Sequence, residues 1–401
     1  MAKDLLLLCH MIPKELECEV WKKSNNNMQD AANALQWNIY EGLSENLSEK
    51  PTVINVMPIG SFPQYYKDAF IKREVFNKNF INTGFCNVKL LRKFMLKSYV
   101  YSELKKYYKN HDCSEKSIIV YTMDSAFLQA LTKLKKKIPD IKICAVVADL
   151  PNMSSLSSKK SFSQRIFGNY LSKKSFSYAN CIDGYVLLTK QMAEYLNISV
   201  PFCVMEGIST ETKDAVSEKK DSELKKILYT GTLHKRFGVV NLVEAFKHIK
   251  KENYRLIICG VGDSEEEIKS AAQKDERIIF KGQVTRDEAL KLQRQATVLV
   301  NPRQNTEEFT KYSFPSKTME YLSSGKPLVA YKLDGIPDEY DKYINYVSDN
   351  SDETLAQTLI AVCEKPLEQR EFHGKQAKKF VLEQKNKIKQ TQKILNLLEQ
   401  L

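Results

Sequence analysis

The sequence of 401 residues lacks any long apolar segment. A helix that spans a membrane needs about 20 consecutive apolar residues. The apolar run near the amino terminus, Leu5–Leu8, soon gives way to polar positions and has neither a basic segment nor a cleavage site beside it. We therefore expect no secretion signal and no transmembrane helix, and we place the protein in the cytoplasm.

Cysteine pairs are also absent. The nine cysteines are scattered from Cys9 to Cys363, and no two are spaced as C-x-x-C or lie beside a histidine cluster. An odd number without metal-binding spacing predicts a reducing compartment and no structural zinc. No internal repeat is visible either.

Basic residues are in excess and unevenly placed. The chain has 61 Lys and Arg against 49 Asp and Glu, a formal charge of +12. Residues 1–210 hold 28 of these basic residues and 19 of the acidic ones, whereas the remaining 191 residues hold 33 and 30. The front half therefore favours an anionic neighbour, which is anionic lipid, a phosphorylated acceptor or nucleic acid.

Short apolar runs alternate with helical patterns along the whole chain, as in doubly wound sheets of buried parallel strands. The runs in the front half are Leu5–Leu8, Thr52–Met57, Ser117–Tyr121, Ile143–Val147 and Gly184–Leu188. The pattern restarts after a charged stretch with Ile227–Thr230, Leu256–Cys259, Ile278–Phe280, Val298–Val300 and Pro327–Tyr331. We predict an α/β protein with a first domain over residues 1–208, a linker over 209–223 and a second domain over 224–385. A long helical stretch begins at about Leu367, and its last part, residues 386–401, is expected to cross toward the first domain.

The strongest local signal is Y-S-F-P-S-K-T-M-E-Y-L-S-S-G-K-P-L-V-A at residues 312–330. Pro315 fits the first turn of a helix, Ser313 or Ser316 can cap it, and Gly325 can end it. A helix start offers unpaired N–H groups to a diphosphate, and Lys317 adds a cation. Glu320, one turn on, would accept hydrogen bonds from ribose hydroxyls. The alternative is an ordinary capped helix with both charges solvated.

Two further glycine turns precede this motif. In Y-T-G-T-L-H-K-R-F-G, residues 229–238, Gly231 allows close approach of a ligand, and Lys235 and Arg236 can neutralise a leaving diphosphate. The segment L-I-I-C-G-V-G-D, residues 256–263, holds only part of the dinucleotide fingerprint and lies in the middle of a domain, so a dehydrogenase is not supported.

Together with F-K-G-Q-V and V-L-V-N-P-R, these motifs resemble the carboxyl-terminal domain of family 4 retaining glycosyltransferases of the GT-B fold, in particular enzymes of capsular or exopolysaccharide assembly. The likeness covers about residues 225–345. It implies two Rossmann-like domains, a nucleotide-sugar donor held by the second one, retention of anomeric configuration and no cofactor or metal. It places the base near Lys281–Val284, the ribose at Glu320, and the phosphates at Gly231, Arg236 and the Ser316–Lys317 turn. The donor-binding residues expected from these motifs are Gly231, Thr232, Gly260, Gln283, Val284, Ser313, Phe314, Pro315, Ser316 and Glu320, with Arg236 and Lys317 as catalytic cations.

The chain departs from the pattern of that family at a few positions. Tyr312 stands where a second glutamate is usual, so Glu307 or Glu308 would have to replace that carboxylate. Thr232 and Phe237 stand where the family often carries Arg and Lys. In the front domain, Ala148 takes the place of a histidine near the reacting carbon.

The front domain is expected to bind the acceptor. The polar segment at residues 22–37, with Asn26 and Asn27, either reaches the acceptor or is a surface turn before a helix. Asp149, after the fourth expected strand, either orients the acceptor hydroxyl, for which we name it catalytic and acceptor-binding, or caps the next helix.

Two basic segments in the front domain remain, at residues 88–109 and 159–174. In V-K-L-L-R-K-F-M-L-K, residues 88–97, helical spacing puts Lys89, Arg92, Lys93 and Lys97 on one face, with Val88, Leu91 and Met95 on another. Such segments suit an anionic membrane surface, single-stranded nucleic acid or plain solvation. We expect membrane contact and no nucleic acid.

The expected function is transfer of a hexose from a nucleotide-diphosphate sugar, such as a UDP-sugar, to a glycan or polyprenyl-linked acceptor in bacterial surface polysaccharide biosynthesis. The enzyme would work in the cytoplasm, at the inner face of the membrane. The alternatives are a catalytically weak GT-B protein that serves as a binding or scaffold subunit, favoured by Tyr312 and Ala148, and a nucleotide-sugar epimerase of the same architecture.

Overall fold

The computed structural model describes residues 4–25, 30–109, 115–150, 177–210 and 223–401. The chain divides into two compact units, which we call unit 1 (Met1–Glu206 with Lys387–Leu401) and unit 2 (Gly207–Asn386). Most of the predicted linker, residues 211–222, lies outside the described residues.

Unit 1 is built on an eight-stranded sheet in the order β10-β9-β8-β7-β1-β2-β5-β4. Its neighbouring strands are parallel except for β4 and β5, which are antiparallel. A separate antiparallel pair joins β3 and β6. The strands are β1 (Asp4–Cys9), β2 (Thr52–Asn55), β3 (Phe70–Ile71), β4 (Glu74–Asn77), β5 (Phe80–Asn82), β6 (Phe85–Cys86), β7 (Lys116–Tyr121), β8 (Lys142–Val147), β9 (Gly184–Leu187) and β10 (Phe202–Val204).

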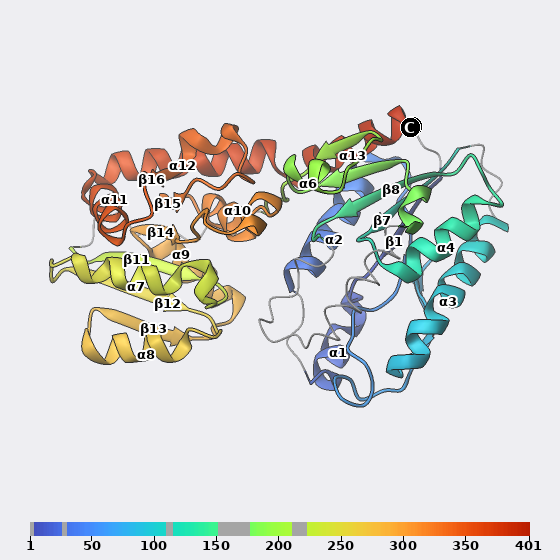
Figure 1. Ribbon diagram of the computed structural model, residues 1–401, viewed down its shortest axis with the longest axis horizontal. Helices are drawn as coiled ribbons and strands as arrows, with labels where there is room; N and C mark the ends of the chain where they lie inside the picture. Colours follow the sequence, from blue (N-terminus) through green and yellow to red (C-terminus); the bar gives the residue numbers. More distant parts are fainter. Residues whose placement is uncertain (1–3, 26–29, 110–114, 151–176, 211–222) are drawn as a thin grey trace. The chain divides into compact units, whose positions relative to one another are not determined.

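The helices of unit 1 cover this sheet on two faces. Helix α3 packs against α4 on one face, and α2 packs against α13 on the other (Figure 1). The helices are α1 (Glu17–Lys23), α2 (Asp30–Asn46), α3 (Lys89–Lys109), α4 (Ser125–Lys135), α6 (Gln191–Tyr195) and α13 (Lys387–Gln400), with 3-10 turns η1 (Lys14–Leu16) and η2 (Ala179–Cys181).

Unit 2 is built on a six-stranded parallel sheet in the order β13-β12-β11-β14-β15-β16. The strands are β11 (Lys225–Thr230), β12 (Tyr254–Cys259), β13 (Ile278–Gly282), β14 (Val298–Asn301), β15 (Leu328–Tyr331) and β16 (Asn345–Val347). The helices are α7 (Val239–His248), α8 (Glu265–Lys274), α9 (Arg286–Gln295), α10 (Ser316–Ser323), α11 (Asp352–Glu364) and α12 (Leu367–Gln384), with 3-10 turns η3 (Lys235–Phe237), η4 (Glu308–Tyr312) and η5 (Asp338–Tyr343).

Successive strand residues of unit 2 enter two separate cores. Ile227 and Tyr229 of β11 pack with α7, α8 and α11, whereas Leu228 packs with α10 and α12. This alternation follows from the two-residue period of a strand. Because both faces are covered, nearly every position of these strands is apolar, which explains why the sequence showed continuous apolar runs.

The ten apolar runs are all strands of the two sheets, so the predicted doubly wound architecture is confirmed. The sequence analysis did not identify the short strands β3, β4, β5, β6, β10 and β16. These have two to four residues each, too few to show a clear periodicity.

The helical stretch predicted from about Leu367 consists of two helices, α12 and α13, with a break at Lys385 and Asn386, where the sequence analysis placed the start of the last part. The carbonyl of Lys385 accepts a hydrogen bond from the Ser209 N–H at 2.8 Å, and the Ser209 hydroxyl donates to the Val381 carbonyl at 2.6 Å. A distant segment thus satisfies carbonyl groups at the end of α12. The second helix, α13, belongs to unit 1, where it packs against α2.

Gly42 permits the close contact between α2 and α13. A Cβ at this position would lie 2.4 Å from the Lys387 carbonyl oxygen and 2.8 Å from Thr391 Oγ1. We predict that Gly42→Ala lowers the free energy of unfolding of unit 1 by about 1–3 kcal/mol through overpacking. Both tryptophans of the chain, Trp21 and Trp37, lie in unit 1, so a urea titration followed by tryptophan fluorescence measures this loss.

Asn38→Ala is the matched control on the same helix, since no hydrogen bond of its side chain is seen among the described residues. Alanine favours helix more than asparagine does, so this variant should unfold at the same or a higher urea concentration. An unfolding midpoint for Gly42→Ala equal to that of the wild type would show that α13 does not need the close approach.

Candidate functional site

The carboxyl ends of β11 and β14 form the centre of the candidate site. These strands are neighbours in the sheet, and the chain proceeds from β11 to β12 on one side and from β14 to β15 on the other. Ligands of open α/β sheets bind where the strand order reverses in this way. The loops after β11 and β14 contain the predicted Gly231, Arg236 and Ser313.

Backbone hydrogen bonds join the loops that follow β11, β12 and β13. The N–H of Gly231 donates to the Cys259 carbonyl at 3.0 Å, and the N–H of Gly260 donates to the Gly282 carbonyl at 2.8 Å. Gly260 has a φ of 143°, and a Cβ there would lie 1.8 Å from the Gly231 oxygen. The predicted residues Gly231 and Gly260 are therefore in contact, and only glycine fits the second position. Thr232 follows, with its carbonyl accepting a hydrogen bond from the Tyr229 hydroxyl at 2.8 Å.

The Glu320 carboxylate joins two helices at this edge. Its Oε1 accepts hydrogen bonds from Lys317 Nζ at 2.8 Å and from Gln293 Nε2 of α9 at 2.5 Å. Gln293 also donates to Thr230 Oγ1 at 3.1 Å, which connects the carboxylate to the end of β11. The Glu320 side chain is still 27% exposed and that of Lys317 35%, so both remain accessible to a ligand.

Sequence reasoning missed Gln293. The residue is fully buried although it lies on a strongly polar helix, so α9 gives no sign of its role. A buried polar side chain is expected to be hydrogen-bonded, and here its partners come from two other elements.

At the start of α10, the backbone N–H groups of Ser316 and Lys317 have no hydrogen-bond partner among the described residues, whereas that of Thr318 donates to the Pro315 carbonyl. Pro315 is the N-cap residue, and no side chain caps the helix, so the expected capping by Ser313 or Ser316 is wrong. Phe314 is buried against Tyr340, which fixes the chain just before the helix. The first N–H groups of an uncapped helix attract anions. Gly325 ends the helix with a φ of 77°, as predicted.

Two arginines and two phenylalanines stack beside this helix start. The Arg303 guanidinium lies 4.3 Å from the Phe237 ring centroid and 5.5 Å from that of Phe309. Arg236 stacks on the same Phe309 ring at 3.9 Å and forms an ion pair with Glu307 at 3.0 Å. Arg236 was predicted for the site, whereas Arg303 was not, although it directly follows the buried run V-L-V-N-P.

Arg303 is a cation whose burial has a cost. Loss of water, together with the neighbouring Arg236, lowers the pKa of Arg303 to about 10. One Nη atom donates a long hydrogen bond of 3.4 Å to Ser313 Oγ, and Nε has no partner among the described residues. A half-buried guanidinium whose Nε has no partner among the described residues is suited to an anionic ligand.

A cavity of about 390 Å³ opens next to these residues. It is lined by Lys235, Arg236, Gly238, Asn241, Gln304, Thr306 and Glu307. Its polar lining and its size suit a sugar or a phosphate group better than an apolar molecule.

Glu308 is the other carboxylate considered as a replacement for the one missing at position 312. It accepts a hydrogen bond from the Tyr312 hydroxyl at 3.3 Å.

Gln283 and Val284, predicted to lie near the base, connect β13 to α9. Gln283 is exposed, while Val284 packs against the core on the α10 side of the sheet. Thr285 caps α9 by accepting a hydrogen bond from the Glu288 N–H. This loop is joined to that of Gly260 through the Gly282 carbonyl, so it lies at the same edge of the sheet.

In unit 1, Asp149 follows β8 and is exposed. Partial loss of water nevertheless raises the pKa of its carboxyl above the usual value. Asn26 and Asn27 lie outside the described residues, as does the segment that Asp149 was expected to cap. The structure therefore describes only Asp149 among the predicted acceptor residues.

His10 is a further polar group in unit 1 that the sequence analysis did not name. It follows β1, stacks on Phe127 with 4.3 Å between ring centroids, and its Nδ1 lies 2.9 Å from the Val56 carbonyl oxygen. Burial lowers the pKa of His10 despite the nearby Asp124. A neutral imidazole thus lies at the carboxyl end of the central strand.

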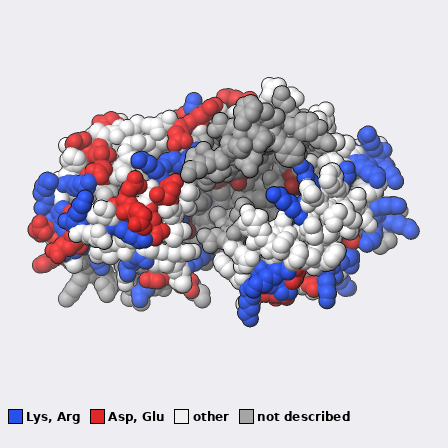
Figure 2. All heavy atoms as spheres, turned by 60° about the horizontal axis from the view of Figure 1, so that its bottom comes forward, with Lys and Arg blue, Asp and Glu red and all other residues white. Residues whose placement is uncertain are grey.

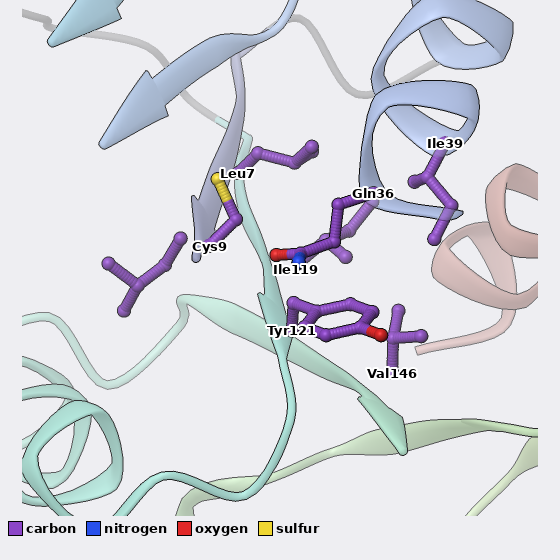
Figure 3. A pocket seen from close by; sticks show the side chains of 8 residues that line it. Leu7, Cys9, Gln36, Ile39, Ile119, Tyr121 and Val146 are labelled. Atoms are coloured by element: carbon purple, nitrogen blue, oxygen red, sulfur yellow. The ribbon is translucent and has the colours of Figure 1, made fainter. Parts of the chain in front are cut away.

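A small cavity of about 10 Å³ lies close to it, between β1, β7, β8 and α2. Figure 3 shows Gln36 and Tyr121 among its mostly apolar lining. The volume suffices for about one water molecule and excludes a sugar.

Among the described residues, no three His, Cys, Asp or Glu side chains are grouped to hold a metal. No helix of the described residues is both long and apolar enough to cross a membrane.

Residues 210–380 match the family model described as glycosyl transferases group 1. An uncharacterized glycosyltransferase of Methanocaldococcus jannaschii is 24% identical over 212 residues, and this match spans 49% of the chain and about half (52%) of that relative. The lipopolysaccharide outer core galactosyltransferase WaaB aligns with a TM-score of 0.63 at 12% identity, over 99% of both chains. A trehalose-6-phosphate protein from E. coli, solved with UDP-2-fluoro glucose, gives a TM-score of 0.65 at 10% identity, again over 99% of both chains.

At such low identity the solved structures establish the fold, while the family match is confined to the part of the chain that forms nearly all of unit 2. Two doubly wound units and a carboxyl-terminal helix that belongs to unit 1 agree with this fold. The chain therefore has the GT-B fold, and residues 210–380 are a domain of the glycosyl transferases group 1 family.

Proposed function

We propose that the protein is a retaining glycosyltransferase that moves a hexose from a nucleotide-diphosphate sugar, such as a UDP-sugar, to a glycan or lipid-linked acceptor of bacterial surface polysaccharide. The observation that carries the proposal is the group of Lys317, Glu320 and Gln293 at the uncapped start of α10, beside Arg303. This group combines anion donors with a carboxylate at the point where the strand order reverses.

Each group has a distinct role toward the donor. The free N–H groups of α10 and the Lys317 ammonium bind the diphosphate, for which Lys317 exchanges its Glu320 partner for phosphate. The second oxygen of Glu320, Oε2, accepts the ribose hydroxyls while Gln293 holds Oε1 in place. Arg303 and Arg236 supply charge to the phosphate that leaves.

Transfer then needs positioned cations more than a strong base. The phosphate oxygen released from the sugar can accept the proton of the attacking hydroxyl on the same face, and Asp149 orients that hydroxyl. No metal is required in this scheme, because the cationic side chains and the helix start stabilise the developing charge. We place the reaction in the cytoplasm, at a membrane that presents the acceptor.

The comparisons support the general class of this proposal. The galactosyltransferase WaaB and the E. coli protein solved with UDP-2-fluoro glucose share the fold over nearly the whole chain. The first is named for galactosyl transfer in lipopolysaccharide, and the second was solved with a nucleotide-sugar analogue.

The second candidate is a scaffold subunit of the same fold. Glu307 is paired with Arg236, and Glu308 accepts a hydrogen bond from Tyr312, so both carboxylates that would replace the missing one are engaged. Sugar release from a panel of nucleotide sugars, followed by mass spectrometry, separates the candidates. A transferase releases nucleoside diphosphate, a scaffold releases nothing, and an epimerase gives an altered sugar without an acceptor.

The first prediction concerns Glu320 and Lys317. Glu320→Gln should raise the dissociation constants of both nucleoside and nucleoside diphosphate about 10-fold to 100-fold, because charged hydrogen bonds to ribose are lost. Lys317→Ala should raise the dissociation constant of the nucleoside diphosphate by a similar factor and leave that of the nucleoside unchanged. Calorimetry with UDP and uridine, or with the best-bound pair of a nucleotide panel, measures both.

Lys291→Ala is the control, since this exposed lysine of α9 has no polar partner among the described residues. It should bind like the wild type. If Glu320→Gln and Lys317→Ala also bound like the wild type, the donor site would lie elsewhere.

The second prediction concerns Arg303. Arg303→Met keeps the stacking on Phe237 but removes the charge, so the affinity for nucleoside diphosphate should fall about 10-fold or more while nucleoside binding stays. Arg286→Met, at an exposed position with no polar partner among the described residues, is the control. Equal losses of nucleoside and diphosphate affinity would indicate a structural role for Arg303 instead.

The third prediction concerns Asp149. If its carboxylate orients the acceptor hydroxyl, Asp149→Asn should lower kcat by about 10² or more while donor binding, measured by calorimetry, stays at the wild-type value. The raised pKa of this carboxyl predicts that activity falls with decreasing pH at a higher pH than for an ordinary aspartate. Wild-type turnover in Asp149→Asn would remove Asp149 from the reaction.

A further inference from the structure

The first two turns of α3 expose large apolar side chains. Leu90 is 69% exposed, Leu91 50%, Phe94 68% and Met95 40%. Phe70 of β3, 74% exposed, lies close to the start of this helix, because β3 pairs with β6 and β6 leads directly into α3. We call these five residues the α3 surface.

Packing within unit 1 leaves the α3 surface uncovered. The opposite side of the helix supplies the buried contacts, through Leu96, Val100 and Leu104. Arg92, expected among the outward cations, instead donates to the Ile59 carbonyl at 2.6 Å and to Asn87 Oδ1 at 3.1 Å, so that expectation is wrong. The amino-terminal part of α3 is thus held in place by an inward arginine while its outer side is apolar.

Cations border the α3 surface and acidic groups are scarce there. Lys89, Lys93 and Lys97 are exposed along the first three turns of α3. The helix has one acidic residue, Glu103, which is buried and paired with Arg73 and Lys106. Figure 2 shows Lys and Arg gathered beside uncharged surface on the half of the molecule that carries α3.

We propose that the α3 surface docks onto an anionic lipid bilayer, with its apolar side chains in the interface and its lysines at the headgroups. Exposed apolar side chains edged by lysine are what an interfacial helix presents to lipid. A second copy of the chain fits less well, because two such surfaces would bring their lysines together. The inference deepens the proposed function, since a lipid-linked acceptor would be presented on that bilayer.

The test is sedimentation of the full chain with vesicles, which requires neither donor nor acceptor. The wild type should sediment with vesicles of phosphatidylcholine and phosphatidylglycerol, and much less with phosphatidylcholine alone or at high salt. The double variant Leu90→Glu/Phe94→Glu should lose about tenfold or more in partition. Glutamate in the first turns of a helix is compatible with its dipole, so the fold should persist, which circular dichroism checks.

Phe372→Glu is the matched control, because Phe372 of α12 in unit 2 is 67% exposed, like Phe94. It should sediment like the wild type. The inference is overturned if the wild type does not bind vesicles, or if the double variant and Phe372→Glu behave alike. It is also overturned if the wild type is a dimer that the double variant makes monomeric, since the occupant is then a second copy. Because donor calorimetry is independent of lipid, either proposal can fail without the other.

Discussion

The divergence of β11 and β14 at the centre of the six-stranded parallel sheet is the constraint on which the candidate site depends. Parallel strands bring all their carboxyl ends to one edge, and the reversal of strand order opens a gap between two loops there. Thr230 ends β11 and Glu320 lies on the helix after β14, yet Gln293 bonds both. Tyr321 of α10 also binds the end of β11. Its hydroxyl accepts a hydrogen bond from the Thr230 N–H at 2.8 Å and donates one to the Thr230 carbonyl at 2.9 Å.

Two of the cations at this edge of the sheet already form ion pairs with carboxylates, and these pairs reduce the binding free energy that a charged ligand can obtain from them. Lys317 is paired with Glu320 and Arg236 with Glu307. A diphosphate that recruits either cation must replace a carboxylate, so its gain is a difference between two charged interactions. Arg303 forms no ion pair within hydrogen-bonding distance among the described residues. A phosphate beside it would relieve an existing desolvation cost, so this cation should contribute more per contact than Lys317, which must first leave Glu320.

Much of the fold could be predicted from the sequence, because strands buried on both faces show as continuous apolar runs. Runs such as Ile227–Thr230 coincide with strands within a few residues. The loop–helix–strand unit from Tyr312 onward was predictable too, since Pro315 and Gly325 mark helix ends by local chemistry. The contact of Lys385 with Ser209 was not, because the two residues are far apart in the chain. Gln293 was missed for the same reason: it looks like any polar residue of an exposed helix until the fold brings Glu320 to it.

The sequence showed that Thr232 and Phe237 depart from the family pattern, but it did not show what Phe237 contacts. Where the resemblance leads one to expect a lysine before Gly238, the chain has Phe237, and its ring carries the Arg303 guanidinium at 4.3 Å. The aromatic side chain thus positions a cation that comes from the other loop at the β11–β14 divergence. An arginine stacked on a ring loses less conformational freedom on binding than a lysine on a flexible stem. The loop after β14 thus supplies a cation that stacks on the residue at 237 in the loop after β11.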